Sequence, residues 1–173
     1  MLRTHIEPVA LALWVLVIAA VCAPVSRALA TSPPASRIPA ADLIQPAELA
    51  AELAAPQAGV ASKPLVLQVG FRTLYDQAHI PGAEYSGAAG EDRGLLTLRE
   101  HVAKLPRDTA IVIYCGCCPW SRCPNVAAAF TALRELGFTR LKVLYIPDNF
   151  GSDWVDKGYP VDKGHAGSAP AGS

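Results

Sequence analysis

The chain has 173 residues, a formal net charge of zero and a hydrophobic content of 51%. This length and composition fit one modest globular domain and exclude a chain that is disordered throughout. Nucleic-acid binding is not expected, because balanced charge leaves no excess of lysine and arginine for contacts with phosphates. The sequence also contains no internal repeat and no glycine-rich phosphate-binding motif.

Residues 1–30 have the three parts of a secretory signal peptide. Arg3 lies in a short polar start, Val9 to Ala23 form a nearly unbroken apolar stretch, and Ala28, Leu29 and Ala30 end it as a small-x-small triplet. An apolar stretch of about 15 residues is short against the ~20 that span a bilayer. We therefore expect cleavage near Ala30 and export to the periplasm or the medium, with membrane contact only through an uncleaved segment. A retained anchor and a lipid-modified Cys22 are the alternatives.

The mature chain is predicted to contain one folded domain between two unstructured ends. Residues 31–41 are rich in Pro, Ser and Ala, which is typical of an extended linker. Residues 163–173 consist mostly of Gly, Ala and Ser and are expected to form a disordered tail. The folded domain is therefore predicted to span residues 42–162.

Within this domain, short apolar runs alternate with stretches of helical periodicity. The apolar runs predict strands at Leu43–Ile44, Leu65–Val69, Glu84–Tyr85, Ile111–Tyr114 and Leu141–Ile146. The periodic stretches predict a helix that starts at Pro46 and further helices at Phe71–Ala78, Leu95–Leu105, Val126–Leu136 and Gly151–Lys157. Such alternation predicts an α/β fold of three layers, in which helices cover both faces of a mainly parallel central sheet.

The most informative stretch is Ile111 to Asn125, which reads IVIYCGCCPWSRCPN. A buried strand stops at Cys115, and three more thiols precede the next helix, at Cys117, Cys118 and Cys123. Ligand sites of parallel sheets lie at the carboxyl ends of the strands. The N-terminus of a helix and its free N–H groups favour an anion and lower the pKa of a thiol placed there. The pattern therefore predicts a reactive thiolate in this loop.

Three motifs, in this order along the chain, resemble those of the rhodanese family of sulfurtransferases. They are AHIPGA at Ala78–Ala83, IVIYC followed by a helix that ends in LGF at Leu136–Phe138, and WVDKGYPV at Trp154–Val161. The resemblance implies a rhodanese-like fold and a thiosulfate-type sulfurtransferase that needs no cofactor. In that family a cysteine thiolate takes a sulfur atom from a small sulfur-containing anion, holds it as a persulfide and passes it to a thiol acceptor.

The resemblance nominates two nucleophiles, because the loop here is longer than the family's. Aligned by the strand, Cys115 takes the catalytic position, whereas counting back from Arg122 places Cys117 at the family's spacing. We favour Cys115, since the sheet fixes the end of a strand while loops absorb insertions. Cys117, Cys118 and Cys123 are then alternative nucleophiles or resolving thiols.

The remaining loop residues are expected to bind the substrate anion. Arg122 carries a guanidinium that would hold the anion and depress the pKa of a nearby thiol. Gly116, Trp120 and Ser121 are expected to complete the substrate-binding loop.

Four thiols in one loop also suit other chemistry. They could perform thiol redox chemistry, in which a neighbouring thiol resolves an oxidised cysteine as a disulfide. They could also bind Cu(I) or Zn(II), although adjacent Cys117 and Cys118 fit one tetrahedron poorly, and the favoured interpretation includes no metal. Because an exported protein meets oxidising conditions, a loop stapled by disulfides and without catalytic activity is the third alternative.

Overall fold

The computed structural model describes residues 37–56 and 63–164. The predicted signal peptide, most of the predicted linker and nearly all of the predicted tail lie outside the described residues. Within the described ranges, no helix is both long and apolar enough to cross a membrane. Export of the chain therefore stays a prediction.

Five parallel strands form the central sheet, in the order β1-β5-β4-β2-β3. Their bounds are Leu43–Ile44 for β1, Leu65–Gln68 for β2, Glu84–Tyr85 for β3, Ile111–Tyr114 for β4 and Leu141–Leu144 for β5. All four residues of the central strand β4 are buried, as expected for a strand that is covered on both faces. The structure thus confirms the predicted parallel α/β sheet.

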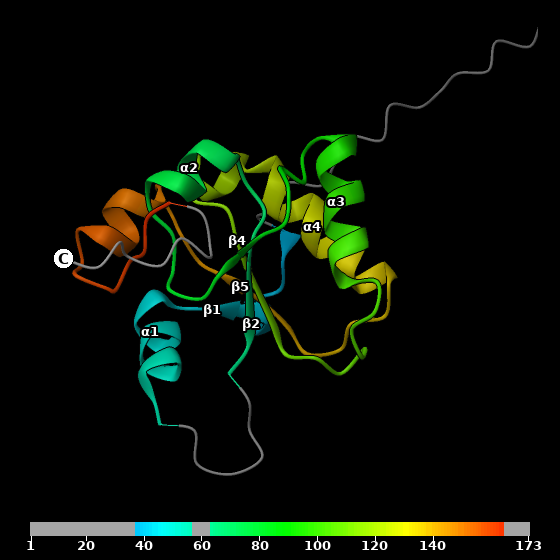
Figure 1. The fold of residues 1–173 in the computed structure, drawn as a ribbon, viewed down its shortest axis with the longest axis horizontal. Helices are drawn as coiled ribbons and strands as arrows, with labels where there is room; N and C mark the ends of the chain where they lie inside the picture. The colour runs from blue at the N-terminus through cyan, green and yellow to red at the C-terminus, as the bar shows by residue number, and fades with distance from the viewer. Residues whose placement is uncertain (1–36, 57–62, 165–173) are drawn as a thin grey trace, which may run out of the picture. The chain divides into compact units, whose positions relative to one another are not determined.

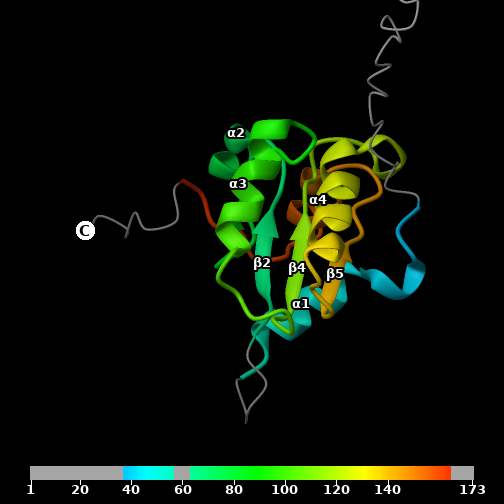
Figure 2. The same cartoon turned by 90° about the vertical axis from the view of Figure 1, so that its right-hand side faces the viewer.

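Successive residues of each strand point to opposite faces of this sheet. Helices cover both faces. Ile111 and Ile113 pack in one core with α3 (Asp92–Val102) and α4 (Pro124–Glu135), which lie side by side over the sheet in Figure 2. Val112 and Tyr114 pack in the other core with α1 (Pro46–Ala54) and the π-helical turn η5 (Gly151–Val155), on the opposite side in Figure 1. The three-layer architecture is therefore confirmed.

Several element boundaries differ from those predicted. Helix α3 begins at Asp92 rather than Leu95, and Gly94 in its first turn lies against Ala88, where an added Cβ would be 1.9 Å from the Ala88 carbonyl oxygen. Gly94 thus permits a close approach between the helix and the preceding segment. Helix α4 begins at Pro124 rather than Val126, because the first position of a helix needs no backbone N–H.

The packed structure extends into residues that were predicted to be linker. Ile38 is buried among the core residues on the α3 and α4 side of the sheet. The short helix η3 (Ala40–Asp42) follows, and the Asp42 carboxylate forms an ion pair of 2.8 Å with the Arg134 guanidinium. At least residues 38–41 therefore belong to the folded domain.

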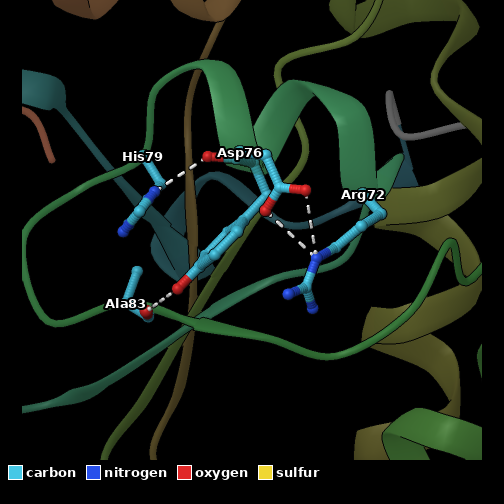
Figure 3. A network of polar contacts seen from close by, with 5 residues as sticks. Arg72, Asp76, His79 and Ala83 are labelled. Atoms are coloured by element: carbon cyan, nitrogen blue, oxygen red, sulfur yellow. Dashed lines mark hydrogen bonds and ion pairs between the residues drawn. The ribbon is translucent and has the colours of Figure 1, made fainter. Parts of the chain in front are cut away.

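The short helix α2 (Arg72–Gln77) holds the AHIPGA turn in place (Figure 3). The Tyr75 hydroxyl donates a hydrogen bond of 2.7 Å to the carbonyl of Ala83. The His79 ring stacks on the Tyr75 ring at 3.9 Å, and His79 Nδ1 lies 2.8 Å from the Tyr75 carbonyl oxygen. Because a carbonyl only accepts, Nδ1 carries the proton. His79 therefore stabilises this turn. In α2 itself, the Arg72 Nε atom forms an ion pair of 3.1 Å with the Asp76 Oδ1 atom.

The same turn also pairs with the C-terminal motif. The backbone N–H groups of His79 and Asp162 each donate to the other's carbonyl oxygen, both at 2.9 Å. The Trp154 indole N–H donates to the carbonyl of Pro160 at 2.8 Å, which closes the WVDKGYPV segment on itself. Two motifs that are far apart in the sequence are thus adjacent in the fold.

Candidate active site

Four sulfur atoms gather where strand β4 ends and the chain leads into α4. We call Cys115, Cys117, Cys118 and Cys123 the cysteine cluster; all four are free thiols. The Cys115 thiol donates to the Cys117 sulfur at an Sγ–Sγ distance of 3.0 Å, and the Cys117 and Cys118 sulfurs are 3.2 Å apart. The sulfurs of Cys115, Cys117 and Cys123 all lie within 4.8 Å of one another. Cys117 is thus the member that the other sulfurs surround.

Gly116 creates the sharp turn that brings the first two sulfurs together. Its φ of +71° is in the left-handed region, which favours glycine. A Cβ on Gly116 would also lie 2.6 Å from the Cβ of Phe150, and the Phe150 N–H donates to the Gly116 carbonyl at 3.1 Å. The turn therefore depends both on glycine at this position and on the segment that leads into η5.

Asn125, in the first turn of α4, holds the cluster from the helix side. Its Oδ1 accepts a hydrogen bond of 2.7 Å from the Gly90 N–H, which leaves the amide nitrogen to face the sulfurs. The Nδ2 atom lies 3.3 Å from the Cys115 sulfur and 3.6 Å from the Cys117 sulfur. Since Asn125 is only 3% exposed, this donor does not turn to solvent.

Cys115 is held tightly at the end of its strand. Its side chain is 3% exposed, and the Gln68 side-chain amide donates to its backbone carbonyl at 3.4 Å. Gln68 also accepts from the Gly70 N–H at 3.2 Å. A Cβ on Gly70 would lie 2.7 Å from the Cys115 sulfur, so the chain after β2 leaves room for that sulfur only because residue 70 is glycine.

The contacts within the cluster place its negative charge on Cys117. The pKa of Cys117 is lowered, first by the thiol of Cys115 and then by the thiols of Cys123 and Cys118 and the amide of Asn125, which donate to its sulfur. The pKa of Cys115 is raised, chiefly because its proton is held in the bond to Cys117. The pKa of Cys118 is raised by burial, and that of Cys123 by its hydrogen bonds to Cys115 and Cys117. Side-chain donors, rather than the expected free N–H groups of the helix N-terminus, thus stabilise the thiolate most.

The cluster opens on a cavity of about 330 Å³ at the carboxyl edge of the sheet. Cys115, Gly116 and Cys117 form one wall of this carboxyl-edge cavity. The ends of β2 and β4, helix α2 and the segment that leads into η5 contribute the others, through Gln68, Tyr114, Leu74, Gln77, Ala78, Asn149, Phe150, Gly151 and Val155. Of the two cysteines that line the cavity, Cys117 is half-buried and Cys115 is buried.

The other residues predicted to bind the substrate lie elsewhere. Trp120, Ser121 and Arg122 form the short helix η4, and Ser121 and Arg122 are exposed. The Trp120 ring contacts the Tyr145 ring edge-on, with ring centroids 5.2 Å apart. None of the three is among the residues that line the carboxyl-edge cavity. Of the predicted binding residues, the structure therefore brings Gly116 alone into its wall, and the anion-binding role of Arg122 stays a prediction.

Sequence reasoning missed two polar residues of the site. Asn125 follows a proline at a helix start, and Gln68 ends an apolar strand. A polar residue that ends a buried strand at a ligand-binding edge is a usable signal for Gln68. No sequence signal separates Asn125 from an ordinary residue of a first helical turn.

Comparison with protein-family models and with curated proteins gives no match. Among solved structures, the crystal structure of the Alr3790 protein from Anabaena sp. matches with a TM-score of 0.53 and 19% identity, over 71% of this chain and 94% of that one. The solution structure of the rhodanese-like domain from the same protein matches with a TM-score of 0.51 and 20% identity, over 76% and 86% of the two chains. The BH2092 protein from Bacillus halodurans matches with a TM-score of 0.53 and 20% identity, over 76% and 83%.

The chain has a rhodanese-like fold. At these identities the likeness concerns the fold alone. Within this rhodanese-like fold, the cysteine cluster lies at the carboxyl edge of the sheet, where ligand sites of parallel α/β sheets are found.

Proposed function

We propose that this protein is an exported sulfurtransferase in which Cys117 accepts a sulfur atom as a persulfide. The observation that carries the proposal is the position of Cys117. Cys117 lines the carboxyl-edge cavity, and its sulfur is contacted by two thiols, at 3.0 and 3.2 Å, and by the Asn125 amide at 3.6 Å. Because the thiolate is the nucleophilic form of cysteine, these donors supply a reactive group at neutral pH.

The choice of Cys117 revises the preference for Cys115 that strand alignment favoured. Cys115 is 3% exposed, its proton is committed to the bond with Cys117, and its pKa is raised. Cys117 is less buried, and its pKa is lowered. Counting back from Arg122 selected Cys117, whereas alignment by the strand selected Cys115. The count from Arg122 thus agrees with the structure as to which sulfur is the more nucleophilic.

The first half-reaction is written for thiosulfate, a small anion with a transferable outer sulfur. The Cys117 thiolate attacks that sulfur, the sulfur–sulfur bond of thiosulfate breaks, and sulfite leaves with the electron pair. The product is a Cys117 persulfide anion, so atoms and charge balance without an added oxidant. A thiol acceptor then removes the outer sulfur and restores the thiolate.

Sulfite release tests this function directly. The reduced full chain is mixed with thiosulfate, and sulfite is measured together with the intact mass of the protein. We expect one equivalent of sulfite per chain, none from the Cys117→Ser variant, and none from wild-type protein alkylated beforehand. Wild-type levels of sulfite from a folded Cys117→Ser protein would exclude Cys117 as the acceptor.

A second candidate function is the handling of a soft metal ion by the cysteine cluster. Three sulfurs lie within 4.8 Å of one another, and bound Zn(II), with Zn–S distances of about 2.3 Å, would require them to be roughly 3.8 Å apart. Thiolates also suit Cu(I). Anaerobic titration with Zn(II) or Cu(I) tests this function: a stoichiometric complex that survives desalting and is lost in Cys123→Ser supports it, whereas removal of all metal by desalting excludes it.

A further inference from the structure

The proposed acceptor sulfur has another thiol in direct contact. The Cys115 thiol lies 3.0 Å from the Cys117 sulfur and is directed at it as a hydrogen-bond donor. Three features fix this arrangement: the turn at Gly116, the hydrogen bond from the Gln68 side-chain amide to the Cys115 carbonyl, and the contacts of the Asn125 amide with both sulfurs. A persulfide formed on Cys117 would therefore have a second nucleophile next to its inner sulfur from the moment it forms.

Cys115 fits this resolving position better than the other two thiols. Cys118 is adjacent to Cys117 in the chain, and consecutive Cα atoms are ~3.8 Å apart, below the ~4.4 Å at which disulfides usually begin. Cys123 lies within 4.8 Å of both Cys115 and Cys117, but the short sulfur–sulfur contacts of Cys117, at 3.0 and 3.2 Å, are those with Cys115 and Cys118. Cys115 and Cys117 flank Gly116, whose left-handed conformation is unstrained because the residue is glycine. The turn brings the two sulfurs to 3.0 Å from each other.

We propose that Cys115 resolves the Cys117 persulfide, so that the protein releases the transferred sulfur as hydrogen sulfide and is left with a Cys115–Cys117 disulfide. This inference rests on the proposed function, because it begins from the persulfide on Cys117. It makes the chain a thiosulfate reductase in a single turnover, rather than a carrier that stores sulfur.

The resolving step balances without an additional reagent. The Cys115 sulfur attacks the inner sulfur of the persulfide, the bond between the inner and outer sulfurs breaks, and the outer sulfur leaves with the electron pair and the Cys115 proton as HS⁻. The outer sulfur is reduced, and the two cysteine sulfurs are oxidised to the disulfide. Renewed turnover then requires a dithiol reductant, which exchanges with the disulfide and returns both cysteines to the reduced state.

One experiment separates this inference from the function on which it rests. The reduced full chain is desalted under argon and mixed with one equivalent of thiosulfate in the absence of any reductant. Sulfite, sulfide and intact mass are then measured. We expect sulfite and sulfide in a ratio close to one, and a protein that has lost two hydrogen atoms and gained no sulfur. Sulfite without sulfide, with a lasting mass gain of one sulfur atom, would overturn the inference and leave the proposed function intact. Absence of sulfite would overturn both.

Peptide mapping identifies the resolving thiol in the same sample. Trypsin would place Cys115, Cys117 and Cys118 together between Asp108 and Arg122, and Cys123 in the next peptide. We expect an internal disulfide in the first peptide, and a bridge between the two peptides would contradict the assignment to Cys115.

Serine variants distinguish the two thiols that share a peptide with Cys117. Cys115→Ser is expected to lower the ratio of sulfide to sulfite at least tenfold and to accumulate the persulfide, whereas Cys118→Ser is expected to keep a ratio near one. The reverse result would transfer the resolving role to Cys118. Should Cys115→Ser fail to fold, fragmentation of the wild-type peptide still decides, because it reports which two sulfurs are joined.

Discussion

At the scale of single residues, the chemistry of the site depends on donors that surround one sulfur. Cys117 receives thiol hydrogen bonds from within the cluster and an amide contact from Asn125. Charge-assisted hydrogen bonds are the stronger ones, and each donor favours the thiolate over the thiol. The pKa of Cys117 therefore lies below the ordinary range of a thiol, while the pKa values of its neighbours lie above it.

Asn125→Asp tests this arrangement with little change in shape. The carboxylate keeps an acceptor for the Gly90 N–H, but it replaces the amide donor with a negative charge next to the Cys115 and Cys117 sulfurs. A like charge at this distance is expected to raise the pKa of Cys117 by about one unit or more. In a titration followed by the ultraviolet absorbance of the thiolate, the variant should lose its signal at a higher pH than the wild type as the pH falls. Coincident curves would show that Asn125 does not act on the thiolate.

Asn125 and Gln68, the two site residues that were not predicted, show which residues the sequence alone does not identify. The thiols were found because cysteines are rare and four of them share one loop. Asn125 and Gln68 act through neighbours that are distant in the sequence, Gly90 for the first and Cys115 for the second. Arg122 was expected at the anion, but the short helix η4 leaves it exposed and outside the cavity wall.

At the scale of elements, the ends of β2 and β4 and the start of α4 shape the site together. Two glycines permit this: Gly70 leaves space for the Cys115 sulfur, and Gly116 turns the chain towards Cys117 and against Phe150. The loop is long, but its two ends belong to a strand and a helix that the sheet and its cores hold in place.

Gly116→Ala should destabilise the protein more than an alanine at a comparable but open position. A left-handed residue other than glycine costs about 1–2 kcal/mol, and the contact with Phe150 is expected to add about 1–3 kcal/mol. Gly158 is the matched control, because its φ is +78° and an added Cβ would meet nothing within 4 Å. Urea unfolding of both variants measures the difference in the free energy of unfolding. Equal losses in the free energy of unfolding would mean that the contact with Phe150 adds no cost, which would contradict the prediction.

Strands were predicted more accurately than helix boundaries, for a physical reason. Runs such as Ile111–Tyr114 are buried on both sides, and continuous apolar sequence marks them directly. The first turn of α3 contains Asp92 and Gly94, whose residue types suit a loop equally well, and only the contact of Gly94 with Ala88 explains the glycine in a helix. The predicted helix at Gly151–Lys157 proved to be a single π-helical turn, Gly151–Val155.

At the scale of the whole molecule, the parallel sheet brings separate motifs to one end of the domain. The AHIPGA turn pairs with Asp162 after the WVDKGYPV segment, and the cysteine cluster lies at the carboxyl edge with η5 nearby. The pairing of the two motifs follows from strand order, which local patterns do not encode, and it was not predicted. The position of the cysteine loop at the carboxyl edge was predicted from the alternation of strands and helices.

Export is the prediction that concerns the whole chain. If residues 1–30 are a cleaved signal peptide, the full-length chain produced in a bacterium with a general secretion pathway should be recovered with Thr31 as its first residue. Intact mass and N-terminal sequencing of the secreted or periplasmic fraction measure this. Recovery of a chain that still begins at Met1 and sediments with membranes would instead indicate a retained anchor.

The most direct test of the account is the identity of the thiol that reacts first. The reduced full chain is treated at about pH 6 with less than one equivalent of iodoacetamide, a neutral reagent that selects thiolates. Fragmentation of the peptide Asp108 to Arg122, and of the next tryptic peptide, which begins at Cys123, then locates the label. We predict that it lies on Cys117 and that it forms faster than on free cysteine at the same pH. A label chiefly on Cys115, Cys118 or Cys123, or a rate no higher than that of free cysteine, would contradict the account.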